Sequence, residues 1–167
     1  MIDQTIVVGW LGLGLVLLPV TLSADPTDEA PTEGQLDPAY AAGKAAIATQ
    51  DWNAAIRSLS SAALRDTHNA DIENYLGYAY RHIGQLELAV THYQRALQLD
   101  PRHRGAHEYL GEAYLMANNL AKAEEHLAAL ERICLIPCEE FEDLKKAVID
   151  YRAHVPQRPC NTRWDRS

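Results

Sequence analysis

The strongest constraint on the fold is a repeat with a period of 34 residues. Glycine recurs at this step, at Gly43, Gly77 and Gly111. Alanine and a large apolar residue recur at the same step, at Ala55, Ala89 and Ala123 and at Trp52, Leu86 and Leu120. A fixed period of this size is typical of chains that stack copies of one supersecondary unit. The sequence therefore predicts an array of similar units.

The middle unit, residues 69–101, has the pattern of two amphipathic helices joined by Gly84 and Gln85. Small or apolar residues of the first helix share one face, at Leu76, Gly77, Tyr80 and Ile83. Those of the second helix do the same, at Leu86, Ala89, Val90, Tyr93, Ala96 and Leu97. Such spacing indicates α-helix. Because neither stripe is wide enough to enclose a core, each helix must pack against the other and against a neighbouring unit.

This pattern resembles the tetratricopeptide repeat, a helix–turn–helix unit. The middle copy matches at Leu76, Gly77, Tyr80, Gly84, Ala89, Tyr93, Ala96 and Pro101. The third copy matches at Leu110, Gly111, Tyr114, Leu120, Ala123 and Leu127, and the first at Gly43, Trp52, Ala55, Leu59 and Ala62. The resemblance implies an all-α solenoid of three repeats, over about residues 36–69, 70–103 and 104–135.

We expect helix pairs at 38–49 and 52–64, at 70–83 and 86–99, and at 105–117 and 120–134. Glycine inside a helix costs about 1 kcal/mol relative to alanine. Its recurrence in the first helix of each unit therefore predicts a close approach between the two helices of that unit. A seventh helix is predicted at 138–154, with an apolar stripe of Phe141, Leu144, Val148 and Tyr151. It fits a capping helix that closes the array, so one domain would cover 36–154.

The two ends of the chain differ from this domain. Residues 6–22 are apolar apart from Gly, Thr and one Pro, and small residues follow up to Ala24. We interpret residues 1–24 as a signal peptide, or alternatively as an uncleaved membrane anchor over 6–22, because the first five residues contain no Lys or Arg. Residues 25–35 read as a disordered acidic linker and 155–167 as a flexible tail. Either N-terminal interpretation places the domain in the periplasm or outside the cell.

The three cysteines are interpreted in that context. Cys134 and Cys138 flank a short turn before the capping helix, and paired cysteines in exported proteins favour a disulfide. Free thiols are an alternative, and the state of Cys160 is left open. A third interpretation combines the pair with His126 in a partial thiolate–imidazole site, which would suit a metal- or redox-handling accessory protein. No histidine set reaches four ligands at a recognised spacing, so we predict surface histidines, no metal site and no cofactor.

Composition and motifs argue against two classes of function. The formal net charge is −8, without a basic stripe, which disfavours nucleic acid and anionic lipid as partners. The sequence also lacks a nucleophile elbow, a phosphate-binding glycine loop and a His-Glu-x-x-His motif. We therefore expect no catalytic activity.

The resemblance also implies a concave groove lined by the first helix of each repeat. The groove residues would be Tyr40, Lys44, Asn74, Tyr78, Arg81, His82, Glu108, Glu112 and Met116. Some family members hold a C-terminal carboxylate in a Lys/Asn clamp. Lys44 and Asn74 match that clamp, but Glu108 and Glu112 would repel a carboxylate. The expected function is a non-catalytic adaptor of the cell envelope that binds a protein or peptide segment, with self-association as a further option.

Overall fold

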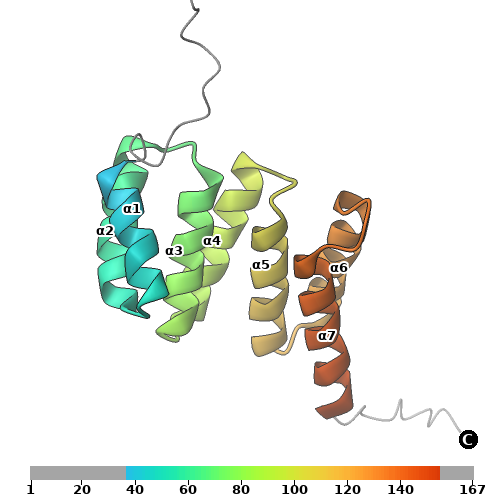
Figure 1. The fold of residues 1–167 in the computed structure, drawn as a ribbon. Helices are drawn as coiled ribbons and strands as arrows, with labels where there is room; N and C mark the ends of the chain where they lie inside the picture. Colours follow the sequence, from blue (N-terminus) through green and yellow to red (C-terminus); the bar gives the residue numbers. More distant parts are fainter. Residues whose placement is uncertain (1–36, 155–167) are drawn as a thin grey trace, which may run out of the picture.

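The computed structural model describes residues 37–154. This part of the chain forms seven α-helices and no strand (Figure 1). The helices are α1 (Pro38–Ala48), α2 (Trp52–Arg65), α3 (Ala70–His82), α4 (Leu86–Leu99), α5 (Arg104–Met116), α6 (Leu120–Ile133) and α7 (Glu139–His154). The predicted all-α architecture of three helix pairs and one capping helix is confirmed.

Several sequence predictions concern residues beyond this range. The signal peptide or anchor (1–24), the acidic linker (25–35) and the tail (155–167) with Cys160 lie outside the described residues. Among the helices between residues 37 and 154, none combines the length and apolar character needed to cross a membrane.

Local capping explains where the helices begin. The Asp37 carboxylate accepts hydrogen bonds from the backbone N–H groups of Ala39 and Tyr40, at 2.8 and 3.2 Å. The Asp51 carboxylate caps α2 by accepting from Ala54 at 2.9 Å. Each bond satisfies an N–H group that the first turn of a helix leaves without an intrahelical partner.

The turn inside each repeat has the same backbone conformation. Gln50, Gly84 and Asn118 occupy equivalent positions and have φ values of 59°, 78° and 56°. Glycine adopts positive φ without steric cost, and asparagine tolerates it better than most residues. The middle and third turns therefore carry the residue types that this geometry favours.

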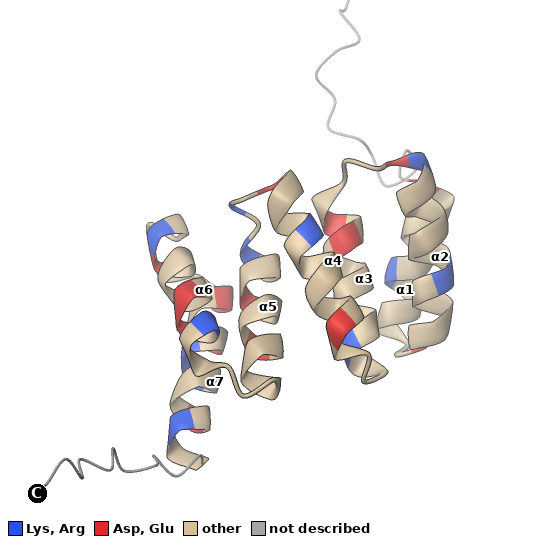
Figure 2. Cartoon of the chain, turned by 180° about the vertical axis from the view of Figure 1, so that it is seen from behind, with Lys and Arg blue, Asp and Glu red and all other residues tan. Residues whose placement is uncertain are grey.

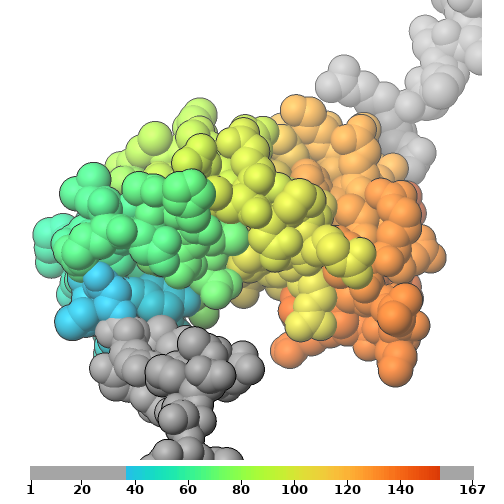
Figure 3. Space-filling view, turned by 90° about the horizontal axis from the view of Figure 1, so that it is seen from above, coloured from blue at the N-terminus to red at the C-terminus, as the bar shows by residue number. Residues whose placement is uncertain are grey.

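Consecutive helices pack against each other, and α1, α3, α5 and α7 also pack in order as an inner row. Figure 3 shows that the stack curves, with its hollow on the side where α1 and α7 lie. The capping helix buries the middle of its predicted stripe, since Leu144 and Val148 are 0% and 2% exposed. It therefore takes the place of a fourth inner helix.

The recurring glycines lie at close helix contacts. A Cβ atom on Gly43 would lie 2.5 Å from Leu59 Cγ in α2, and one on Gly77 would lie 2.6 Å from Tyr93 Cδ1 in α4. These are contacts within one unit, as predicted. Gly111 differs, because its Cβ would lie 2.6 Å from Leu144 Cδ2 in the capping helix. Gly111 thus allows the close approach of α7 to α5, and not that of α6, the second helix of its own repeat.

The two cysteines near the capping helix are joined in the structure. Cys134 caps the end of α6 and is disulfide-bonded to Cys138, just before α7, with 5.9 Å between their Cα atoms. That separation is ordinary for a disulfide. The bond closes the turn between α6 and α7, whose apolar residues Leu135 and Ile136 are 97% and 80% exposed.

Candidate functional site: the concave face

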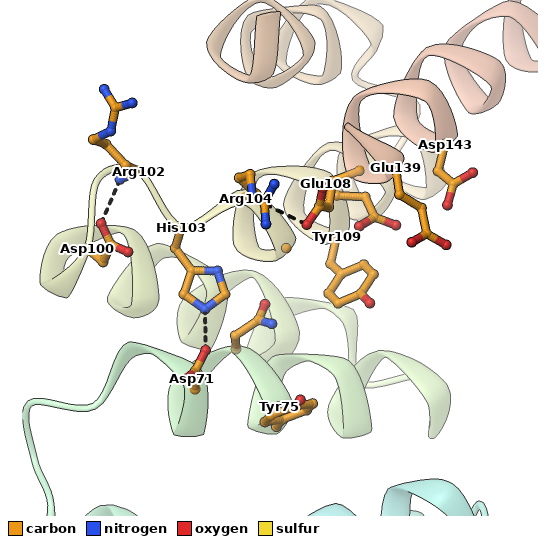
Figure 4. Close-up of a pocket in the computed structure, with 13 residues that line it drawn as sticks. Asp71, Tyr75, Asp100, Arg102, His103, Arg104, Glu108, Tyr109, Glu139 and Asp143 are labelled. Atoms are coloured by element: carbon orange, nitrogen blue, oxygen red, sulfur yellow. Dashed lines mark hydrogen bonds and ion pairs between the residues drawn. The ribbon is translucent and has the colours of Figure 1, made fainter. Parts of the chain in front are cut away.

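The concave face contains a cleft of 530 Å³ between α3, α5 and α7. Its walls are side chains of α3, of the loop between α4 and α5, of α5 and of the first turns of α7 (Figure 4). The capping helix thus supplies one wall of this cleft. The cleft and the aromatic side chains beside it form the candidate site.

Five side chains beside the cleft form what we call the aromatic cluster: Trp52, Tyr78, Arg81, His82 and Tyr109. The His82 ring stacks on Trp52 with 4.1 Å between ring centroids. Tyr78 lies 4.5 Å from His82 and 5.0 Å from Tyr109. These contacts link α2, α3 and α5, one helix from each of the three repeats, so the rings hold one another in place.

Arg81 fixes the middle of the aromatic cluster. Its guanidinium carbon lies 5.5 and 5.3 Å from the ring centroids of Tyr78 and Tyr109, which is cation–π distance. The guanidinium also forms an ion pair with Glu112 on α5. Its side chain is 13% exposed, so the pair is largely shielded from water. Aromatic and arginine side chains held in this way are the types that dominate protein interfaces.

The cleft itself is rich in carboxylates, and some of them are paired. Asp71 lies 2.9 Å from Nε2 of His103, and Glu140 lies 3.5 Å from Nε of Arg104. The Asp100 carboxylate accepts the backbone N–H of Arg102 at 2.9 Å.

Three further carboxyl groups of the cleft, Glu108, Glu139 and Asp143, have no ion pair within residues 37–154. Figure 4 shows these three side chains together on the α7 side of the cleft, whereas Arg102 points away from them. Glu108 is only 8% exposed. Its burial and the neighbouring carboxylates of Glu112, Asp143 and Glu140 raise the pKa of Glu108 to about 8, and Arg81 offsets part of this effect.

Asn74, on the α3 wall of the cleft, is 5% exposed. Its side-chain oxygen has no hydrogen-bond partner in the part of the chain that the structure describes. Buried polar atoms rarely lack a hydrogen-bond partner, because no bond then replaces the hydrogen bonds to water that burial removes. Asn74 thus adds a buried acceptor without a partner to a cleft that also contains three carboxyl groups without ion pairs.

The structure divides the predicted groove residues into three groups. Asn74 and Glu108 line the cleft, and Tyr78, Arg81, His82 and Glu112 form or contact the aromatic cluster. The remaining three are separate. Tyr40 is 8% exposed, so it offers little surface to a partner, and Lys44 lies over its ring at 5.7 Å. Met116, at the end of α5, is 56% exposed.

Sequence reasoning missed much of this surface, including Trp52 and Tyr109 in the aromatic cluster and Glu139 and Asp143 in the cleft. Trp52 was assigned only to the repeat pattern, and it lies on the second helix of its unit. Glu139 and Asp143 could have been found from the sequence, because a capping helix that follows a third repeat occupies the next inner position. Its first turns were therefore candidates for the groove wall.

The sequence predicts surface histidines, but this prediction does not hold for all of them. His107 is 9% exposed, and its Nδ1 lies 2.9 Å from Nδ1 of His126. Because His107 Nε2 donates to the Pro101 carbonyl at 3.1 Å, its Nδ1 must accept from His126 when the ring is neutral. His126 therefore bonds to another histidine while Cys134 and Cys138 bond to each other. Within residues 37–154, no three His, Cys, Asp or Glu side chains are grouped to hold a metal.

We expect this histidine pair to destabilise the protein in acid. Burial lowers the pKa of His107, and burial, His107 and Lys122 lower that of His126 to about 4. The unfolded chain, with an ordinary histidine pKa of about 6.5, binds the extra proton first. The contribution of His126 to the free energy of unfolding should therefore fall by about 1–2 kcal/mol between pH 7 and pH 4.

Urea unfolding of the wild type and of His126→Gln, measured across that range, tests this expectation. The difference between the two proteins should shrink as the pH falls. His68→Gln is the control, because His68 is exposed, and it should leave the pH profile unchanged. A constant difference between wild type and His126→Gln would contradict the assignment.

Parts of this chain are similar in sequence to known proteins. A family model described as TPR repeat matches residues 77–117. Two curated relatives from Oryza sativa subsp. japonica, DnaJ protein P58IPK homologs A and B, are each 28% identical over 126 residues. That alignment covers 73% of this chain and 23% of each relative, so the chain spans about a quarter of their length.

Solved structures share the fold. The TPR2B domain of yeast Sti1 in its pHsp70 complex has a TM-score of 0.65 at 17% identity, covering 70% of this chain and 95% of that one. The first TPR of Spaghetti (RPAP3), bound to the HSP90 peptide SRMEEVD, scores 0.62 at 16%, covering 68% and 93%. The Yersinia enterocolitica chaperone SycD scores 0.63 at 18%, covering 74% and 86%. Three stacked helix pairs and the family model over residues 77–117 thus identify repeats of the tetratricopeptide type in this chain.

Proposed function

We propose that this protein is a non-catalytic adaptor of the cell envelope that binds a segment of another protein along its concave face. The observation that carries the proposal is the aromatic cluster. It holds three aromatic side chains, one histidine and one arginine in mutual contact beside a cleft. Preorganised anchors of this kind lower the entropy cost of binding.

The fold relatives support a peptide as the ligand class. The yeast Sti1 domain is in a complex with pHsp70, and the RPAP3 domain is bound to an HSP90 peptide. The charge of the present cleft argues against a carboxylate tail as the ligand here. Lys44 lies over Tyr40 and does not line the cleft, whereas Glu108, Glu139 and Asp143 do. We therefore propose an internal segment of the partner.

Charge also bears on the class of partner. Figure 2 shows Lys and Arg scattered over several helices, and the net charge of the chain is −8. Neither feature suits a phosphate backbone, whose binding relies on clustered cations. A protein segment is the partner class that agrees with both the charge and the aromatic cluster.

The location in the envelope is proposed from the apolar run over residues 6–22 and from the cysteine pair. A disulfide between Cys134 and Cys138 would persist in an oxidising compartment, where such bonds are common. Cell fractionation and thiol titration of the purified protein test this part. A cytoplasmic protein with both thiols free would contradict it, whereas metal bound through the thiols would favour the metal-handling alternative.

Site-specific photocrosslinking in cells tests the groove. A photoreactive residue at His82, which is exposed on the concave side, should crosslink a discrete partner. The same residue at Leu88, exposed on α4, is the control and should not. Tyr78→Ala should weaken the crosslink about tenfold, because it removes the central ring of the cluster. Equal crosslinking from His82 and Leu88, or no effect of Tyr78→Ala, would contradict the proposed function.

A further inference from the structure

We propose that the cleft between α3, α5 and α7 receives a Lys or Arg side chain of the partner segment. The inference rests on the proposed function, since it assumes a protein segment in the groove. It adds the chemistry of one contact: a cationic hydrogen-bond donor from the partner meets Asn74, Glu108 and Asp143.

The inventory of donors and acceptors in the cleft carries the argument. Carboxylates and amide oxygens accept hydrogen bonds, and lysine and arginine side chains only donate. Glu108, Glu139 and Asp143 lack ion pairs within the described residues, although two arginines also line the cleft. Arg104 is paired with Glu140, and Arg102 points away from the three carboxyl groups (Figure 4). These three groups are therefore acceptors without a matching donor in the cleft.

A cluster of acidic side chains on a surface is usually just solvated, but this cleft also contains a buried polar group. Asn74 is 5% exposed, lines the cleft and has no partner for its side-chain oxygen within the described residues. Asn74 lies on α3, across the cleft from Asp143 on α7. A neutral oxygen on one wall and carboxyl groups on the other suit a group with several N–H donors, such as an ammonium or a guanidinium.

The state of Glu108 agrees with this occupant. In the absence of a partner, burial and the carboxylates of Glu112, Asp143 and Glu140 hold the pKa of Glu108 at about 8, against the opposing effect of Arg81. An incoming cation would favour the ionised carboxylate. The cost of burying Glu108 would then be offset in the complex and not in the free protein.

The test begins with an array of immobilised peptides, each with one fixed residue and random flanking positions, probed with the full chain. The best binder is then made with Lys, Gln or Glu at the fixed position, and each affinity is measured by fluorescence anisotropy. The Lys peptide should bind about tenfold more tightly than the Gln peptide, the scale of one charge-assisted hydrogen bond. The Glu peptide should bind most weakly.

Two variants assign that preference to the cleft. Glu108→Gln/Asp143→Asn should bind the Lys and Gln peptides equally. Glu87→Gln/Glu125→Gln also replaces two carboxyl groups by amides, but at exposed positions on α4 and α6, so it should keep the preference. Circular dichroism confirms that both variants are folded, which is expected because the substitutions preserve side-chain shape.

The outcomes separate this inference from the proposed function. Peptides that bind without regard to charge, or a preference that survives Glu108→Gln/Asp143→Asn, would overturn the cationic contact and leave groove binding intact. No binding of any peptide would overturn both. If MgCl2 or CaCl2 removes the Lys preference, but NaCl of equal ionic strength does not, the cleft is a metal-ion site and the inference is wrong.

Discussion

Glu108→Gln is expected to stabilise the folded protein by about 2 kcal/mol at pH 8 and to have little effect at pH 4. Glu108 is 8% exposed among other carboxylates, and these surroundings raise its pKa to about 8. The folded protein must therefore either keep this group protonated or bury its charge, and both cost free energy at pH 8. An amide of the same shape avoids that cost.

The direction of the pH dependence follows from proton binding. In the unfolded chain the Glu108 pKa has its ordinary value near 4.5, so the group ionises there first as the pH rises. Between pH 4.5 and pH 8 the folded state binds more protons than the unfolded state. The free energy of unfolding of the wild type therefore falls with pH over this window, whereas the variant lacks this contribution.

Urea unfolding at pH 4, 6 and 8 measures the effect. The increase in the free energy of unfolding caused by Glu108→Gln should grow from pH 4 to pH 6 and again to pH 8. Glu87→Gln, at an exposed position on α4, should give no increase. A loss of stability at all three pH values would mean that Glu108 makes a favourable contact in the folded state. The same variant is expected to weaken the preference for a cationic peptide, so stability would rise as binding specificity falls. Binding sites commonly have a lower stability than the same fold would have without the groups that bind the ligand.

The fold could be predicted from the sequence because its determinants are local and repeated. The 34-residue period places Gly43, Gly77 and Gly111 at equivalent positions, and apolar spacing defines each helix. The α4 helix begins and ends where predicted, at Leu86 and Leu99. These features are visible in the sequence alone, because they depend on residue spacing and not on contacts between helices.

The site was harder to predict because its contacts are between units. Asn74 and Glu108 were assigned to the groove through the family resemblance, but their neighbour Asp143 belongs to a helix outside the repeat pattern. Burial of His107 also depends on a long-range contact, its bond to His126. No spacing rule specifies a pairing of this kind.

The glycines show where the repeat pattern stops being informative. By period alone, Gly111 should contact the α6 residue equivalent to Tyr93, but it contacts Leu144 of α7 instead. The capping helix packs against the inner row more closely than a repeat analogy suggests. For this reason the three glycine positions should not respond equally to substitution.

Gly77→Val is expected to destabilise the protein by about 3 kcal/mol, at the upper end of the usual cost of overpacking. A Cβ atom at this position would lie 2.6 Å from Cδ1 and 2.7 Å from Cε1 of Tyr93. Tyr93 is 0% exposed, in the centre of the stack, so its ring cannot move aside without displacing α4. Gly111→Val should cost less, because it meets the terminal methyl groups of Leu144 on the last helix.

Urea unfolding of both variants tests this order, with Ala45→Val, at an exposed position of α1, as the control for placing a β-branched residue in a helix. A double-mutant cycle then assigns the cost to one contact. Tyr93→Ala removes the whole ring that a Cβ atom at position 77 would meet. It should destabilise the wild type by more than it destabilises Gly77→Val, since it relieves the clash in the variant. Equal effects in the two backgrounds would show that the glycine serves the helix backbone and not the close approach of α3 and α4.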